Sequence, residues 1–222
     1  MGLLERMFGK KPTFAERVWL TEERKLEDFE KQLETDSREG AVTSLAIYHF
    51  PITGERVRQR LDRRGLEYRE LRRPGTDQLE QLPTWRGAGT IAVLASDEIP
   101  EEIKRGIHHR RRVDDQTPVR VQLVEHFPMP QRDDHVLNLA MYLPRGTTFS
   151  CYTGLDEPWV TKFLGSSTRE LLERLGASDD EPLSHSMISA ALRRAQEQLA
   201  KKRRSLEQPA RSCEEWMERN VS

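Results

Sequence analysis

The amino-acid sequence predicts an α/β fold in which a mostly parallel sheet is flanked by helices. Apolar, β-rich runs alternate with helical patterns along the first part of the chain, as expected when helices connect parallel strands. From residue 166 onward the strand signals stop and only helical patterns follow. We therefore predict an N-terminal tail (residues 1–13), one α/β domain (residues 14–165) and an α-helical C-terminal extension (residues 166–222).

The predicted strands are apolar runs bounded by turn residues. The strongest, residues 41–50, is almost continuously apolar and lies between Gly40 and Pro51, which indicates a strand buried on both faces. The remaining strand signals are shorter, and the run at residues 119–124 alternates apolar with polar residues. Further strands are predicted at residues 67–71, 90–95, 119–124 and 147–152.

The predicted helices fall between and after these strands. Residues 21–34 combine helical spacing with many Glu/Lys pairs. Thr53 is predicted to cap a helix over residues 54–64 that ends at Gly65. Ser212 and Glu215 are expected to form a capping box for a short helix anchored by Trp216. The other helices are predicted at residues 98–107, 132–142, 157–164, 168–175 and 186–202.

Composition narrows the class of protein. The 222 residues include 36 basic and 37 acidic side chains, so net charge gives no overall attraction to nucleic acid or anionic membrane. Cys151 and Cys213 lack CxxC spacing, and Cys151 sits in an apolar run typical of a buried strand. A reducing, cytoplasmic location is the simplest interpretation. No membrane span is expected, because no run approaches the roughly 20 apolar residues that one needs.

Two sets of residues resemble the second motor domain of SecA, the ATPase that drives preprotein translocation. Residues 171–176, 180–189 and 195–196 are similar to the end of that domain, with the spacing kept. Residues 88–92 and 131–137 are similar to a strand and a helix of its sheet. The resemblance extends over roughly residues 14–202, and it implies a RecA-like α/β domain, the C-terminal lobe of a helicase-type motor.

The phosphate-contacting residues of that family are replaced here. The family carries a glutamine and three arginines that reach the ATP phosphates, and fixed positive charge of this kind stabilises a phosphoryl transition state. Three apolar side chains and an asparagine cannot supply it. The four positions are Val136, Asn138, Ala140 and Leu143.

The loop after the predicted strand at residues 90–95 also lacks the phosphate-contacting residues of the family. In the family it is rich in glycine and contains an arginine, whereas here it carries Asp97, Glu98 and Glu101, which would repel phosphate. No GxxxxGK[ST] phosphate loop occurs anywhere in the sequence. Hydrolysis of ATP by this chain alone is therefore not expected.

Our first hypothesis is a non-catalytic, SecA-like pseudo-motor domain that acts as an interaction or regulatory module linked to protein translocation. It has no predicted catalytic residues, cofactor or metal, and residual ATP binding and the oligomeric state are left open. A protein partner would bind the degenerate motor face, defined as Val136, Asn138, Ala140, Leu143, Asp97 and Glu98.

A second hypothesis is a nucleotide-binding or hydrolytic enzyme with a rebuilt site at the carboxyl ends of the strands, where open α/β sheets usually bind ligands. Ser96, Asp97, His126 and Arg132 are the candidates, and a polar pocket with convergent side chains would favour it. Asp133 lies at the start of a predicted helix. An acidic residue there interacts favourably with the helix dipole and needs no catalytic role.

A third hypothesis is weak nucleic-acid binding through a basic patch. The alternative interpretation of the same residues is a solvated loop with no binding role. Adjacent histidines chelate poorly, and neither a carboxylate nor a cysteine stands at ligand spacing, so no metal site is expected there. The patch consists of Lys104, Arg105, His108, His109, Arg110, Arg111 and Arg112.

Overall fold

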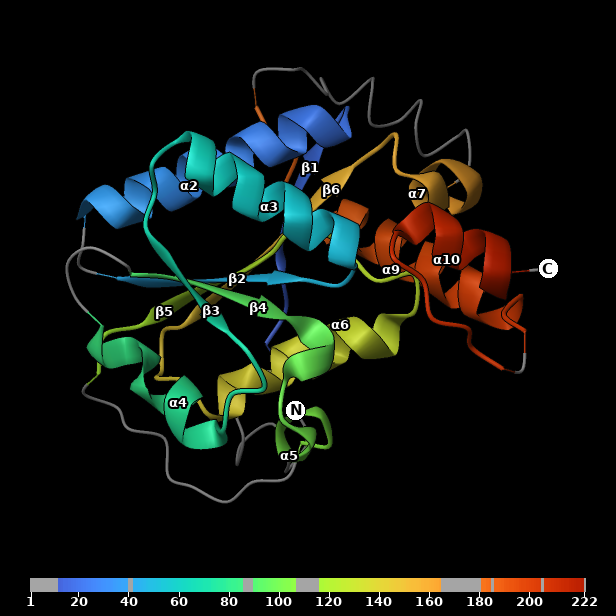
Figure 1. The fold of residues 1–222 in the computed structure, drawn as a ribbon. Helices are drawn as coiled ribbons and strands as arrows, with labels where there is room; N and C mark the ends of the chain where they lie inside the picture. The colour runs from blue at the N-terminus through green and yellow to red at the C-terminus, as the bar shows by residue number, and fades with distance from the viewer. Residues whose placement is uncertain are drawn as a thin grey trace.

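A single sheet organises the part of the chain that the computed structural model describes, which is residues 12–39, 42–85, 90–106, 116–164, 181–184, 186–204 and 206–221. All pairings within this sheet are parallel (Figure 1). The strand order is β1-β6-β5-β2-β4-β3. The strands are β1 (Ala15–Trp19), β2 (Thr43–Tyr48), β3 (Tyr68–Leu71), β4 (Ile91–Ala95), β5 (Val119–Leu123) and β6 (Thr148–Gly154).

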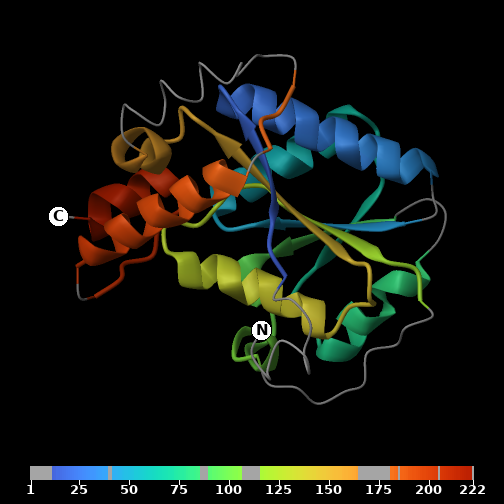
Figure 2. The same ribbon diagram turned by 180° about the vertical axis from the view of Figure 1, so that it is seen from behind.

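The helices form three groups around the sheet (Figures 1 and 2). Two cover one face, three lie on the opposite face, and three gather beside the carboxyl ends of the strands. In that order they are α2 (Glu22–Glu39) and α3 (Pro51–Arg63), then α4 (Thr76–Gln81), α5 (Glu101–Lys104) and α6 (Pro130–Leu137), then α7 (Pro158–Phe163), α9 (Ser186–Lys201) and α10 (Cys213–Asn220). Short 3-10 helices occur at Leu82–Thr84, Ser96–Glu98 and Asn138–Met141.

The predicted architecture is confirmed: the chain has an α/β fold with a parallel sheet, helices on both faces and helices at the C-terminal end. The finer assignment of this fold as RecA-like stays a prediction. The sheet is held by apolar side chains from its central strands. In β2, Leu45 and Ile47 pack toward α4 and α6, while Ala46 packs toward α2 and α3. Burial of both faces explains why this strand reads as a nearly continuous apolar run.

Several element boundaries differ from the prediction. Strand β1 was not predicted because its sequence contains Glu16 and Arg17. It is the last strand of the sheet beside β6, and on its other side Val18 forms an isolated antiparallel bridge with Leu183. The helix predicted at residues 98–107 is broken at Pro100, which cannot donate a backbone hydrogen bond, and only α5 follows it. The helix predicted at residues 132–142 begins at Pro130 and narrows to a 3-10 helix from Asn138.

The C-terminal helices share a hydrophobic core with the sheet. Ile188 and Leu192 of α9 and Trp216 of α10 pack in one cluster with Val18 of β1 and Phe50 after β2. The division at residue 165 stays a prediction, as does the helix at residues 168–175, which lies outside the described residues. Packing through one cluster indicates that α9 and α10 contribute to the stability of the sheet.

Candidate functional site

The carboxyl ends of β2, β4 and β5 meet where the chain reverses direction across the sheet. After β2 the chain leads to β3 on one side, and β5 lies on the other side of β2. In open α/β sheets this switch point is the usual ligand site. Here α9 and α10 lie beyond the ends of these strands (Figures 1 and 2).

An aromatic cluster closes the end of β2. The rings of Phe50 and Phe127 are stacked with centroids 5.2 Å apart. Trp216 of α10 packs edge-on against Phe127 at 5.3 Å. Trp216 is only 1% exposed, which confirms its predicted role as the anchor of the last helix. Ser212 caps that helix by accepting a bond from the Glu215 amide at 3.1 Å, but the Glu215 carboxylate accepts from Arg211 instead of closing the predicted box.

A carboxylate of the chain itself occupies the anion position at the start of α3. Glu125 accepts hydrogen bonds from the amides of His49 (3.2 Å) and Phe50 (3.0 Å) and from the Thr53 hydroxyl (2.7 Å). The predicted cap was wrong in detail: α3 begins at Pro51, and Thr53 donates to Glu125 instead of capping the helix. Burial raises the pKa of Glu125, and Lys25 opposes that shift. The start of this helix is where α/β proteins commonly bind phosphate.

A carboxylate of the chain also accepts a hydrogen bond at the start of α2. Asp156 accepts a hydrogen bond from the Glu22 amide at 2.7 Å. Next to it, Lys25 and Glu157 form a buried ion pair with 2.7 Å between Nζ and Oε1. Glu157 also accepts from the Gly154 amide at 2.8 Å. At the starts of α2 and α3, carboxylates of this chain therefore already accept hydrogen bonds from backbone amides.

Asp133, in the first turn of α6, is the centre of a second buried network. Its carboxylate contacts His49 Nε2 (2.9 Å) and His126 Nδ1 (2.6 Å), and accepts from the Phe127 amide (2.9 Å) and Gln196 Nε2 (2.7 Å). Burial alone would raise its pKa, but the charge and hydrogen bond of His126 outweigh burial and hold the pKa far below its ordinary value. Because Gln196 belongs to α9, this network links the extension to the sheet.

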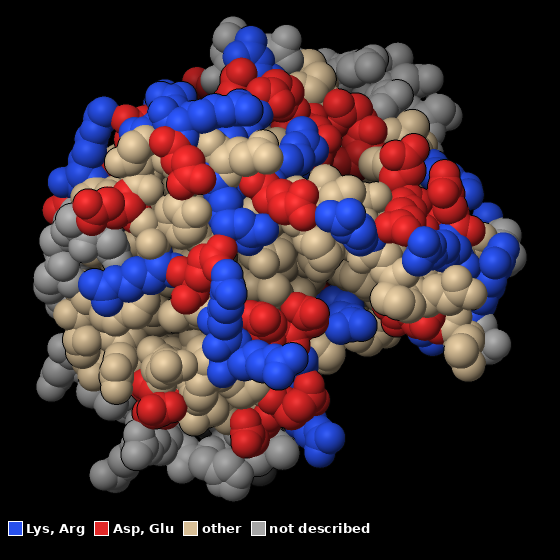
Figure 3. Space-filling model, viewed as in Figure 1, with Lys and Arg blue, Asp and Glu red and all other residues tan. Residues whose placement is uncertain are grey.

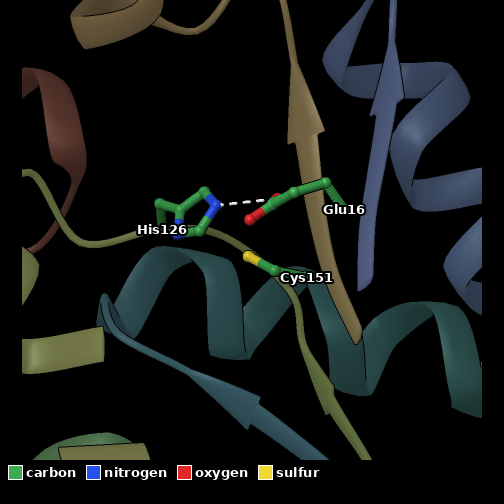
Figure 4. Close-up of side chains that lie close together, drawn as sticks. All are labelled: Glu16, His126 and Cys151. Carbon is green, nitrogen blue, oxygen red and sulfur yellow. Dashed lines mark hydrogen bonds and ion pairs between the residues drawn. The ribbon is translucent and has the colours of Figure 1, made fainter. Parts of the chain in front are cut away.

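His126 joins that network to β1 and β6 (Figure 4). Its Nε2 lies 2.9 Å from Glu16 Oε2, and the Cys151 sulfur points into the same space. Donor atoms of these three buried residues all lie within 4.8 Å of one another. Burial lowers the pKa of His126, but the Cys151 sulfur and the carboxylates of Glu16 and Asp133 outweigh it and raise that pKa well above 6.5. Burial raises the pKa of the Cys151 thiol to about 12.

A cavity of about 270 Å³ adjoins this network on the side of α9. It lies between β1, α6 and α9, so residues far apart in the sequence form its wall. Those that carry or adjoin the network are Phe14, Glu16, His126, Asp133, Arg193 and Gln196. The cavity is therefore bordered by titratable groups on one side and by an exposed arginine-carboxylate pair, Arg193 with Asp134, on another.

The predicted motor face divides into buried and exposed residues. Val136, Ala140 and Leu143 are at most 4% exposed and belong to the core beneath the sheet, so in this structure they cannot contact a partner as expected. Asn138 is half-buried and donates to the Lys104 carbonyl at 3.1 Å. The two acidic residues of the predicted face are more accessible. Asp97 is exposed, and Glu98 is half-buried and accepts a hydrogen bond from the Arg73 amide at 3.3 Å.

Of the four residues proposed for a rebuilt site, two are brought together. Ser96 bonds His49 Nδ1 at 2.7 Å, and through His49 it connects to Asp133 and His126. Asp97 points outward, and Arg132 stacks over the Phe127 ring at 5.3 Å. Sequence reasoning missed His49, Glu16, Glu125 and Cys151, and it treated Asp133 as a dipole residue. His49 and Glu125 follow the ends of β2 and β5, and that position was a usable signal; Glu16 and Cys151 lie within strands and had none.

The basic patch is only partly described. Residues 108–112 lie outside the described residues, which leaves Lys104 and Arg105. Lys104 Nζ donates to the Asp97 carbonyl at 2.6 Å and to Glu101 at 2.8 Å, so it is engaged within the chain. On the face shown in Figure 3, basic and acidic side chains are interspersed, without a broad region of one sign. Nucleic-acid binding therefore stays a prediction with no added support.

No family model and no curated protein sequence matches the chain. Two solved structures are similar at 14% identity: the C-terminal part of the Fun30 ATPase domain, with a TM-score of 0.42, and the helicase domain of Pyrococcus furiosus Hef, with a TM-score of 0.38. The first match covers 80% of this chain and 54% of that one, and the second covers 62% and 27%. The chain thus spans about half of one and a quarter of the other.

These likenesses concern the fold alone. The ATPase and helicase activities are those of the two similar proteins. Among the described helices, none is long and apolar enough to cross a membrane.

Proposed function

We propose that this chain is a non-catalytic RecA-like module that acts by binding another protein, and that it is related to the second motor domain of SecA. The observation that carries the proposal is Glu125 at the start of α3. Its carboxylate takes the position where a nucleotide phosphate would need donors, and two amides and a hydroxyl already bind it. A phosphate would meet negative charge instead of free donors.

The replaced arginine positions support the same proposal. Val136, Ala140 and Leu143 now contribute side chains to the core, so these positions have a structural role that an arginine could not fulfil. The loss of the phosphate contacts is therefore coupled to the stability of the fold. This coupling favours a module whose catalytic contribution has been replaced over one that regains it when a ligand binds.

The link to protein translocation rests on the sequence resemblance to SecA. We propose that the partner is a component of that process, and the exposed Asp97 and half-buried Glu98 make a basic surface on the partner the best match. An affinity capture from native cytosol, with and without ATP, would identify the partner. A variant with Asp97→Lys and Glu98→Lys should lose it, whereas Glu214→Lys on α10, far from that loop in the sequence, should keep it.

Turnover and binding of ATP by the purified chain test the non-catalytic part. We expect no hydrolysis above the buffer rate and no saturable binding of a fluorescent ATP analogue. Glu125→Gln removes the negative charge but keeps the size of the side chain, so it separates repulsion from blockage. Ordinary turnover by the wild-type chain would overturn the proposal.

One observation favours a second candidate function, a rebuilt ligand site. The cavity of about 270 Å³ reaches Glu16, His126 and Asp133, which is a convergent polar set at the carboxyl edge. A hydrolytic enzyme would use such a set for proton transfer. Screening the chain against generic ester and phosphoester substrates, with His126→Asn as the inactive control, would distinguish the two candidates.

A further inference from the structure

We propose that Glu16, His126 and Cys151 form a binding site for a divalent transition-metal ion, with zinc as the natural occupant. The three residues come from β1, the loop after β5, and β6, so no sequence spacing reveals them. Their potential donor atoms lie within 4.8 Å of one another. The inference does not depend on the proposed function, because an ion could serve either a binding module or an enzyme.

The donor set selects the type of ion. A thiolate, an imidazole and a carboxylate together suit zinc, which accepts sulfur, nitrogen and oxygen ligands. Hard ions such as magnesium and calcium prefer oxygen donors and would leave Cys151 unused. Two cysteines are present in the chain, but only Cys151 lies beside a histidine and a carboxylate in this group.

The distances need little adjustment. A tetrahedral zinc ion with ordinary bond lengths holds neighbouring donor atoms about 3.3–3.7 Å apart. The observed limit is 4.8 Å, and Glu16 Oε2 lies 2.9 Å from His126 Nε2. The hydrogen bond between them would open as the ion enters, and the Cys151 sulfur would move closer. Figure 4 shows the three side chains directed toward one another.

An independent observation is the orientation of the His126 ring. Histidines that bind metals nearly always donate their other ring nitrogen to a carboxylate or carbonyl. Here Nδ1 lies 2.6 Å from Asp133 Oδ2, which leaves Nε2 for the ion. Asp133 is itself fixed by the Phe127 amide and Gln196. The outer shell of the site is therefore already in place.

The cavity beside the network provides the fourth position and a route of entry. It is lined by Glu16 and His126, and its volume of about 270 Å³ exceeds what water needs. Zinc sites with three protein ligands usually complete their tetrahedron with water or substrate. On binding, the ion would replace the proton of the Cys151 thiol, because only the thiolate binds metal well.

Cobalt spectroscopy of the full chain tests the proposal. Chelator-treated protein is titrated with Co²⁺, and we expect one ion per chain, with a thiolate charge-transfer band and the visible bands of tetrahedral cobalt. Adding Zn²⁺ should remove both. Cys151→Ser should abolish the charge-transfer band, and Glu16→Gln should weaken affinity at least tenfold. The matched control is Cys213→Ser, which removes the other cysteine and should change neither result.

X-ray absorption on the zinc-loaded wild-type chain covers the case in which a variant fails to fold. One sulfur ligand with nitrogen or oxygen neighbours is expected. The proposal is overturned by a zinc shell without sulfur, by a charge-transfer band that survives Cys151→Ser, or by no cobalt binding to the folded wild-type chain.

Discussion

His49 and Asp133, which are 84 residues apart in the sequence, are joined by a 2.9 Å contact between Nε2 and Oδ1. This contact links the end of β2 to the first turn of α6 across the carboxyl edge of the sheet. The same carboxylate contacts His126 and Gln196, so one buried side chain connects the sheet, helix α6 and the C-terminal extension. The stability of the edge therefore depends on Asp133.

Replacing Asp133 by alanine should destabilise the fold strongly. The change removes the carboxylate that His49, His126 and Gln196 share, and removal of one member of a buried charged pair costs about 3–5 kcal/mol. Urea unfolding measures this loss. The neighbouring Asp134→Ala is the matched control, because Asp134 pairs with Arg193 near the surface and such pairs are worth about 1 kcal/mol or less. Equal effects of the two changes would contradict the role given to Asp133.

The stability of the chain should depend on pH through His126 and Asp133, measured with a chelator present. The pKa of His126 is raised by folding, so its stabilising contribution is full below about pH 6.5 and is lost as pH rises through the folded value. The pKa of Asp133 is lowered, so its contribution is present above about pH 4 and is lost as pH falls.

Urea unfolding of the wild-type chain and of His126→Asn at several pH values isolates the first effect. The variant should lose less stability than the wild type between about pH 6.5 and pH 8.5, while both lose stability below about pH 4. If the two curves ran parallel on the alkaline side, His126 would not be the group responsible.

The central strands could be predicted from the sequence, but the candidate site could not. Strand β2 is apolar on both faces because helices cover both, and that burial is visible as a run of apolar residues. Edge strand β1 shows no such run, because Glu16 points into the network while Arg17 pairs with Asp28. Its polar residues are explained only by partners that the sequence does not place.

The network shows the same limitation. Asp133 was correctly placed at the start of a helix, where an acidic residue has a local explanation. Its contact with His49 arises because β2 and β5, which are distant in sequence, end side by side in the sheet. Likewise, Val136 and Leu143 were interpreted as an exposed face from a family resemblance, but the side-chain direction is set by the rotation of α6 and the turn after it. Local patterns do not determine either property.

Removing one partner of the buried ion pair between Lys25 and Glu157 should lower the stability of the fold. Lys25→Met leaves the Glu157 carboxylate buried without its cation, which we expect to cost about 3–5 kcal/mol. Adding Glu157→Gln removes the stranded charge but keeps an acceptor for the Gly154 amide, so the double variant should recover part of the loss. Arg24→Met, in the surface pair with Glu27 on the same helix, is the control and should cost about 1 kcal/mol or less.

Trp216 should be the main anchor of the C-terminal extension. Trp216→Ala removes a large side chain from the aromatic cluster at Phe127, and such truncations cost about 3–5 kcal/mol. Leu206, which is 80% exposed in the same part of the chain, is the control, and Leu206→Ala should change stability by no more than about 0.5 kcal/mol. Thermal unfolding would show whether the sheet and α10 melt together, as their shared core predicts. Two separate transitions in the wild-type chain would contradict this.

Restoring arginine should destabilise the fold strongly at the buried core positions and only weakly at half-buried Asn138. Leu143→Arg places an unpaired charge in the core, so we expect a loss of several kcal/mol. Asn138→Arg gives up one hydrogen bond to the Lys104 carbonyl, worth about 1 kcal/mol, and its side chain can extend toward solvent. Urea unfolding compares the two, and an ATPase assay should show no turnover in either. A stable Leu143→Arg chain that hydrolyses ATP would mean that the catalytic contribution can be regained by one change, against the coupling of these positions to the core.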